Sequence, residues 1–285
     1  MPISLHAAEY SEPSQMSVGY VITTPEVRSP LMPGVRGDFG ENLGVLKDLG
    51  YDTLEVAMRD PEDPDAQGVE AEIARSGFSV TMIGSAPSEL QDGVMMCHPD
   101  AEIREAGAAR LRSLIDAGEK LGALGVNIGR FRGTCIPGEM WETSNGWMRD
   151  AMRAGSDYAA ARGMKIYIEP YNRYETNFIN TVRQGMEYVK EENHAGLALM
   201  IDSCWMNSED ASIPGAIFAA RDWIEYVHVA DSTRGYPGSA HIHFGDFIRA
   251  LREIGYEGVL SVQIDQKPAF RVAAERSIRL LRCYL

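Results

Sequence analysis

Residues 197–229 read LALMIDSCWMNSEDASIPGAIFAARDWIEYVHV. Two short apolar runs, LALMI at 197–201 and IEYVHV at 224–229, flank a segment that predicts a helix near 213–220. Runs that are apolar at nearly every position are typical of strands buried on both faces. A strand, a helix and a second strand of this kind form one unit of a parallel sheet.

The same alternation recurs on both sides of this stretch. It predicts further strands at 18–23, 53–57, 79–83, 125–128, 165–168 and 258–262. It predicts helices at 37–49, 64–75, 99–121, 147–161, 181–191, 213–220, 245–254 and 269–281. Eight strand–helix units in roughly 250 residues match a closed barrel. We therefore expect one α/β domain over residues 18–285, a single (β/α)8 TIM barrel. The alternative, an open doubly wound sheet, is disfavoured because no GxGxxG follows the first strand.

Composition excludes several classes of protein. Of the 285 residues, 27 are Lys or Arg and 41 are Asp or Glu, which gives a net charge of −14. This charge argues against nucleic acid and against an anionic membrane surface as partners. No apolar run is long enough to span a bilayer. Residues 1–17 lack the pattern of a signal peptide, and we expect an N-terminal arm there. The four cysteines form no CxxC motif, which favours a reducing, cytoplasmic compartment.

Four polar side chains stand at the ends of four successive predicted strands. They are Glu169, Asp202, His228 and Gln263. The carboxyl ends of the strands form the catalytic face of a (β/α)8 barrel, so these side chains are expected to converge. Two carboxylates, one imidazole and one carboxamide are oxygen and nitrogen ligands that suit Mn²⁺, Mg²⁺ or Co²⁺. The spacing of the four residues together predicts a site for one divalent metal. Taken alone, each carboxylate is more typical of a helix cap, the histidine of a core residue and the glutamine of a loop.

Three segments resemble a known family. IEPYNRYETNFINT from residue 168, IDSCWMN from residue 201 and VHVADSTRGYPGSAHIHFGDFIRALREIGYEG from residue 227 are similar to the xylose-isomerase-like sugar isomerase/epimerase barrels. The D-tagatose and D-allulose 3-epimerases have the most similar motifs. The resemblance implies that Glu169, Asp202 and His228 bind the metal and that Glu175 and Arg234 contact substrate hydroxyls. It covers the chain from about residue 18 onward.

Two positions depart from the 3-epimerase pattern. Trp205 stands where those enzymes have a histidine that binds the substrate's end, and an indole suits stacking on a sugar face or on an aromatic aglycone. Gln263 stands where they have a glutamate that is both a metal ligand and a catalytic base. A carboxamide can offer its oxygen to a metal but cannot accept a proton at neutral pH. With the metal polarising the carbonyl, we expect enolisation of a keto-sugar with Glu169 as the single base.

One-base chemistry leaves more than one reaction open. The enzyme is expected to be a sugar isomerase/epimerase type or, alternatively, a lyase that eliminates from a 3-oxo-glycoside, as in the similar catalytic subunits of C-glycoside deglycosidases. An inactive sugar-binding barrel and an endonuclease IV-like phosphodiesterase are further alternatives. Mn²⁺ is the metal that we expect first. The partners expected are a small sugar or glycoside and a homo-oligomer, or a small second subunit if the protein is a deglycosidase.

The segment after the fourth predicted strand, residues 129–147, is long and rich in charged and aromatic residues. Loops on this face of the barrel build the substrate pocket. We therefore expect a lid there in which Arg132 and Trp141 bind substrate and Glu139 or Glu142 supplies a second proton donor.

Overall fold

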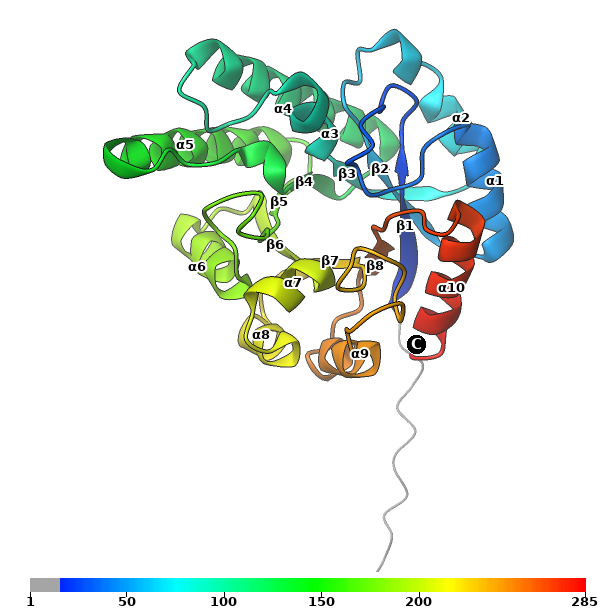
Figure 1. Cartoon of the computed structure of the whole chain (residues 1–285). Coiled ribbons are helices and arrows are strands. Elements are labelled where there is room, and N and C mark those ends of the chain that lie inside the picture. The colour runs from blue at the N-terminus through cyan, green and yellow to red at the C-terminus, as the bar shows by residue number, and fades with distance from the viewer. Residues whose placement is uncertain (1–15) are drawn as a thin grey trace, which may run out of the picture.

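The computed structural model describes residues 16–285 and confirms the closed (β/α)8 barrel (Figure 1). Eight parallel strands follow one another in sequence order, and the last pairs with the first, so the sheet has no free edge. The strands are β1 (Ser17–Thr23), β2 (Thr53–Ala57), β3 (Ser79–Gly84), β4 (Gly125–Ile128), β5 (Lys165–Ile168), β6 (Leu197–Asp202), β7 (Ile224–Val229) and β8 (Val259–Val262).

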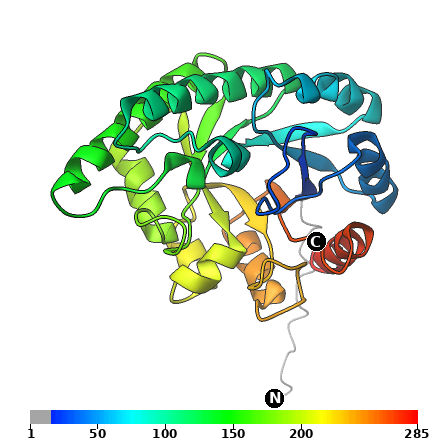
Figure 2. The same cartoon turned by 45° about the horizontal axis from the view of Figure 1, so that its top comes forward.

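Helices surround the strands (Figure 2). They are α1 (Phe39–Leu49), α2 (Val69–Ser76), α3 (Ala86–Asp92), α4 (Ala101–Leu121), α5 (Trp141–Ala160), α6 (Val182–Glu192), α7 (Ser203–Glu209), α8 (Ile213–Ala219), α9 (Phe244–Glu253) and α10 (Phe270–Arg282). The red helix α10 lies beside the blue helix α1, so the ring of helices closes where the sheet closes (Figure 1).

Four helical features differ from the sequence prediction. The helix expected at 64–75 is a 3₁₀ turn, Pro64–Ala66, followed by α2. Helix α5 begins at Trp141, so the second half of the expected loop 129–147 is helical. Helices α3 and α7 were not expected, because seven residues are too few to show a helical period. Short helices of this kind are recognised by their caps, and α7 has its cap in Asp202.

The expected N-terminal arm falls mostly on residues 1–15, which lie outside the described residues. Ser17, the last residue of that expected arm, is the first residue of β1. None of the helices between residues 16 and 285 is both long and apolar enough to cross a bilayer.

The core has two layers because successive strand residues face opposite sides of the sheet. In β5, Ile166 and Ile168 pack outward into the large cluster between the sheet and the helices. Tyr167 instead faces the barrel interior, where it packs with residues of β3, β6, β7 and β8, namely Met82, Ala198, Met200, Tyr226 and Val259. This inner layer fills the barrel interior beneath the carboxyl ends of the strands.

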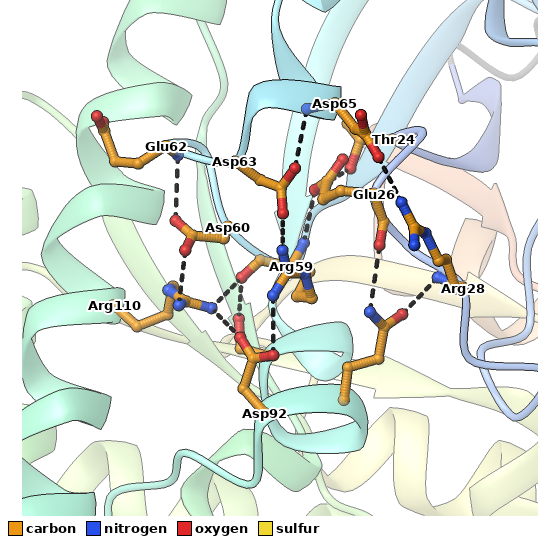
Figure 3. Close-up of polar contacts among 12 residues, drawn as sticks. Thr24, Glu26, Arg28, Arg59, Asp60, Glu62, Asp63, Asp65, Asp92 and Arg110 are labelled. Atoms are coloured by element: carbon orange, nitrogen blue, oxygen red, sulfur yellow. Dashed lines mark hydrogen bonds and ion pairs between the residues drawn. The ribbon is translucent and has the colours of Figure 1, made fainter.

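A network of charges joins the loops that follow β1, β2 and β3 (Figure 3). Arg59 pairs with Asp63 and with Asp92, whose Oδ1 lies 2.9 Å from Arg59 Nη1. Arg110 of α4 donates to Asp92 at 2.8 Å and to Asp60 at 2.9 Å. Asp92 is shared by Arg59 and Arg110, so these ion pairs connect the segment after β2 with α3 and α4.

Candidate metal centre and active site

Three of the four predicted ligands converge at the carboxyl ends of β5, β6 and β7. One donor atom each from Glu169, Asp202 and His228 lies within 4.8 Å of the others. Asp202 and His228 are direct partners in the parallel register of β6 and β7. All three side chains are buried, with at most 2% of the residue exposed. Among residues 16–285, no other group of His, Cys, Asp and Glu side chains is gathered in this way.

His228 is held between carboxylates on both of its ring nitrogens. Nδ1 lies 3.1 Å from Glu169 Oε1 and 3.6 Å from Asp202 Oδ2, and Nε2 lies 2.7 Å from Glu55 Oε2. Burial alone would lower the pKa of His228, but the charges of Glu55 and Glu169 outweigh it and raise the pKa well above its usual value. The carboxylates around His228 therefore favour positive charge on the imidazole or next to it.

Asp202 has a local and a long-range role. Its Oδ1 accepts hydrogen bonds from the backbone amides of Cys204, at 2.8 Å, and Trp205, at 3.2 Å, and so caps the N-terminus of α7. Its Oδ2 accepts from Arg234 Nη1 at 2.6 Å. Burial would raise the pKa of Asp202, but Arg234 and His228 hold it below its usual value. Asp202 is therefore available as an anion.

The carboxylate of Glu169 is positioned from several directions. Its Oε2 accepts from Asn127 Nδ2 of β4 at 3.3 Å. The backbone amide of Glu169 donates to Ile128 at 3.1 Å, which continues the β4–β5 ladder by one residue. A Cβ atom at Gly129 would lie 2.6 Å from Glu169 Oε2, so a glycine is needed at that point. These contacts hold the carboxylate toward Asp202 and His228.

Gln263 follows β8 and is joined to the other ligands through Arg234. Arg234 Nη2 donates a hydrogen bond to Gln263 Oε1, while Nη1 of the same guanidinium binds Asp202. Gln263 is 5% exposed, and its backbone amide donates to Val229 at 3.2 Å. Arg234 has a φ of 61°, a left-handed conformation that is unusual for a residue with a Cβ. Its backbone is fixed there by hydrogen bonds to Asp231 and from Asp265, both of 2.8 Å.

Trp205 lies on α7 and is already stacked within the protein. Its ring centroid is 4.6 Å from that of Tyr171, and Arg234 Cζ lies 4.4 Å from the Trp205 ring. The indole Nε1 is buried and has no hydrogen-bond partner. Trp205 therefore fixes the guanidinium that bridges Asp202 and Gln263, in addition to any surface that it offers to a ligand.

The donor set fits a divalent cation. Two carboxylates and an imidazole supply two formal negative charges and one neutral nitrogen, and Gln263 supplies a further oxygen close to Asp202 through the shared Arg234. With Nε2 occupied by Glu55, His228 turns Nδ1 toward Glu169 and Asp202. Two carboxylates and an imidazole lone pair facing one another are stable only when a proton or a metal ion lies between them.

Glu55 of β2 was missed by sequence reasoning. It is fully buried, and its strand reads TLEVA, which predicts only a buried strand. A glutamate at the middle of a buried strand was the available signal, because a buried carboxylate needs a partner. Glu55 also changes the charge balance of the site. Together with Glu169 and Asp202 it brings three carboxylates, and Arg234 offsets one of them.

Arg132 is enclosed by backbone carbonyl groups. It is fully buried, and its guanidinium donates to the backbone carbonyls of Ile128, Gly129, Glu169, Phe178 and Ile179. The expectation that Arg132 contacts substrate is therefore corrected, because no face of its guanidinium is exposed. It joins the end of β4 to the end of β5 and to the loop that follows β5.

Glu175 and Trp141 lie on loops and helices outside the buried centre. Glu175 forms an ion pair with Arg130, which also pairs with Glu89 of α3. Trp141 is half-buried at the start of α5 and lines a groove between α5 and α6, which none of the four strand-end residues lines. Trp141 therefore forms part of the wall of that groove. The two candidate proton donors nearby, Glu139 and Glu142, are exposed.

A closed (β/α)8 barrel with two carboxylates, an imidazole and a carboxamide at its carboxyl rim has the architecture of a metal-dependent barrel enzyme. The chain belongs to the xylose isomerase-like TIM barrel family, whose family model matches residues 43–283. This membership confirms the resemblance seen in the sequence.

Relatives within the family are enzymes that act on sugars. A ketose 3-epimerase from Arthrobacter globiformis is 30% identical over 223 residues, which cover 74% of this chain and 72% of the relative. A 3-dehydro-D-guloside 4-epimerase from Escherichia coli (strain K12) is 26% identical over 226 residues, covering 76% of this chain and 84% of the relative. The chain is therefore an enzyme of the sugar isomerase/epimerase type.

Solved structures share the fold. The crystal structure of a D-allulose 3-epimerase from a Methylomonas species in complex with D-allulose superposes with a TM-score of 0.80 at 22% identity. The match covers 96% of this chain and 98% of that chain. The barrel is therefore shared over nearly its whole length.

Proposed function

We propose that this enzyme enolises a keto-sugar with a single base, Glu169. The C–H bond next to the carbonyl breaks, its proton passes to the Glu169 carboxylate, and the electron pair moves into the carbon skeleton toward the carbonyl oxygen. Glu169, Asp202, His228 and Gln263 would hold one divalent cation, with Mn²⁺ the first candidate and Mg²⁺ or Co²⁺ the alternatives. When bound, that cation supplies a Lewis acid that polarises the substrate carbonyl.

The observation that carries the one-base proposal is the carboxamide of Gln263 at the end of β8. Its oxygen accepts a hydrogen bond from Arg234, so the amide is oriented with that oxygen toward the guanidinium. Inversion of a carbon needs a proton acceptor on one face and a donor on the other. An amide cannot exchange a proton at neutral pH. Reactions that need one base are therefore favoured over epimerisation at C3.

The contacts around Glu169 suit a base that must be held still. Asn127 donates a hydrogen bond to one carboxylate oxygen of Glu169, and Arg132 donates to the Glu169 backbone carbonyl at 2.8 Å. These contacts restrict the movement of both the side chain and the backbone of Glu169. Arg234, Glu175 and Trp205 are the candidate substrate contacts. Arg234 and Glu175 carry charges that suit sugar hydroxyls, and Trp205 is a partly exposed aromatic ring that packs against Arg234.

One-base enolisation supports two outcomes. The proton can return from Glu169 to the former carbonyl carbon while the hydroxyl proton of the neighbouring carbon passes to the former carbonyl oxygen, which interconverts an aldose and a ketose. Alternatively, the electron pair can expel a leaving group two carbons from the carbonyl, which cleaves a 3-oxo-glycoside as a lyase. For the second candidate, only the substrate class has support from a relative: the Escherichia coli relative is named as a 4-epimerase of a 3-dehydro-D-guloside, which is a 3-oxo-glycoside.

Proton NMR in D₂O distinguishes these outcomes. Enzyme stripped with a chelator and reloaded with Mg²⁺ would be incubated with free ketoses and with 3-oxo-glucosides, and Glu169→Gln would serve as the matched control. Exchange or relocation of an α-proton of a free ketose indicates an isomerase. Release of an aglycone with free ketoses unchanged indicates a lyase. Rapid inversion at C3 of a ketose by the unmodified enzyme would contradict the one-base proposal.

A reducing, cytoplasmic compartment agrees with the four free cysteines.

A homo-oligomer is proposed if the enzyme is an isomerase, and a complex with a small second subunit if it is a deglycosidase-like lyase. Size measurement of the purified enzyme in solution tests both.

A further inference from the structure

Glu55 lies in the middle of β2, one layer below the candidate ligands at the carboxyl ends of the strands and in direct contact with His228. Leu54 and Val56 pack outward against the helices, so Glu55 faces the barrel interior. Its register partners in β1 and β3 are Val21 and Met82, which are both fully buried and apolar. Burying a carboxylate among apolar residues costs free energy of folding unless hydrogen-bond donors surround it, so the partners of Glu55 indicate its role.

One oxygen of Glu55 collects three donors from two other strands. Oε2 lies 2.7 Å from His228 Nε2, and it accepts from Ser261 Oγ at 3.0 Å and from Tyr226 OH at 3.2 Å. The other oxygen, Oε1, is buried and has no partner. The carboxylate is therefore oriented by its Oε2 contacts alone, and the shortest of them is to His228.

We infer that Glu55 is a positioning residue for His228, on the premise of the metal site proposed above. By accepting the Nε2 proton, Glu55 selects the tautomer whose Nδ1 lone pair faces Glu169 and Asp202. It also restricts rotation of the ring, because Nε2 is held by Glu55 while Nδ1 lies against Glu169. A carboxylate on the far nitrogen makes an imidazole a stronger metal donor and commonly changes affinity by about 10- to 100-fold.

The residues around Glu55 and His228 also limit the movement of these two side chains. Tyr226 OH lies 3.0 Å from Thr81 Oγ1, and its ring packs edge-on against the His228 ring at a centroid distance of 5.9 Å. A Cβ atom at Gly84 would lie 3.3 Å from Glu55 Oε1 and 3.2 Å from Ala57 Cα, so a side chain at position 84 would crowd this oxygen of the carboxylate. Glu55 therefore has little freedom to leave the imidazole.

The test compares Glu55→Gln with Thr81→Val by titration with Mn²⁺, following the signal of free Mn²⁺ by electron paramagnetic resonance. Thr81 belongs to the same buried network but touches neither Glu55 nor His228 in the contacts described. We expect Glu55→Gln to weaken Mn²⁺ binding about 10- to 100-fold. Thr81→Val should change it by less than about twofold, since it removes only a more distant hydroxyl. Equal affinity of Glu55→Gln and the unmodified enzyme would overturn the inference.

A second measurement on the unmodified enzyme covers the case in which Glu55→Gln does not fold. In Mg²⁺-loaded protein labelled with ¹⁵N-histidine, the His228 signals, assigned by comparison with His228→Asn, should show a proton on Nε2 and none on Nδ1. A proton on Nδ1 would overturn the positioning role. If the unmodified enzyme binds no Mn²⁺ at all, the proposed function fails together with this inference, whereas normal binding with the wrong tautomer removes this inference alone.

Discussion

Arg234 donates a hydrogen bond to the carboxamide oxygen of Gln263 at the point where the 3-epimerase motif has a glutamate. The same guanidinium binds Asp202 at 2.6 Å and stacks on Trp205, so the side chain of Arg234 is fixed on three sides. A carboxylate at position 263 would form an ion pair with this arginine without a change of geometry.

Gln263→Glu is therefore expected to fold normally and to gain epimerisation at C3, because it adds the second proton-transfer group. Inversion of a free ketose, followed by NMR or by chromatography, measures the gain. Gln263→Ala is the matched control, since it removes the amide without adding a base. A variant that binds metal yet shows no inversion would mean that the missing base is not what limits this enzyme.

Glu169→Gln should lower turnover by about 10²- to 10⁴-fold, because the carboxamide cannot take the substrate proton. The change keeps the shape of the side chain, so the hydrogen bond from Asn127 and the fold should persist. Single-turnover rates and the thermal unfolding temperature would be measured together. Activity within tenfold of the unmodified enzyme, with the fold intact, would refute the assignment of Glu169 as the base.

Asp202→Ala should lose bound metal, which elemental analysis of the purified protein measures. It also removes the cap of α7, a loss that costs about 1 kcal/mol of stability. Asp202→Asn separates the two effects, since an asparagine still caps the helix but carries no charge. Full metal occupancy in both variants would show that Asp202 is not a ligand.

Arg132→Met should destabilise the protein by about 3 to 5 kcal/mol, because five buried backbone carbonyls lose hydrogen bonds to one guanidinium. Burial lowers the pKa of Arg132 to about 10, so the group stays charged at neutral pH. Urea unfolding measures the change. Arg130→Met is the control, with an expected loss near 1 kcal/mol, since its ion pairs with Glu89 and Glu175 are partly exposed. Similar losses in both variants would contradict the supporting role of Arg132.

Asp210, which follows α7, should reduce stability as the pH rises. Burial raises the pKa of the Asp210 carboxyl to about 6. The hydrogen bond that this carboxyl accepts from the backbone amide of Val182 acts in the opposite direction and is the smaller effect. The unfolded chain then loses this proton near pH 4 and the folded protein near pH 6, so its cost develops between these values and persists above them. Asp210→Asn should add about 1 to 2 kcal/mol at pH 7, after allowance for partial exposure, and nothing at pH 4. A difference that is the same at both pH values would contradict this account.

The barrel and its four strand-end residues could be predicted from the sequence because both depend on local patterns. Buried strands are apolar at nearly every position, and the residue after each strand falls on the catalytic face whatever the details of packing. Glu169, Asp202 and His228 were found in this way, and the structure brings them together.

Tertiary structure alone decided what lies behind those residues. Glu55 and His228 are 173 residues apart, and alternation within a strand buried on both faces does not say which residues point into the barrel. That choice depends on how all eight strands are staggered around the ring. Arg132 was misjudged for a similar reason, since a charged residue in a loop becomes a buried support only when several carbonyls from distant segments surround it. The sequence therefore determined which functional groups stand at the carboxyl ends of the strands, and long-range packing determined which residues hold them in place.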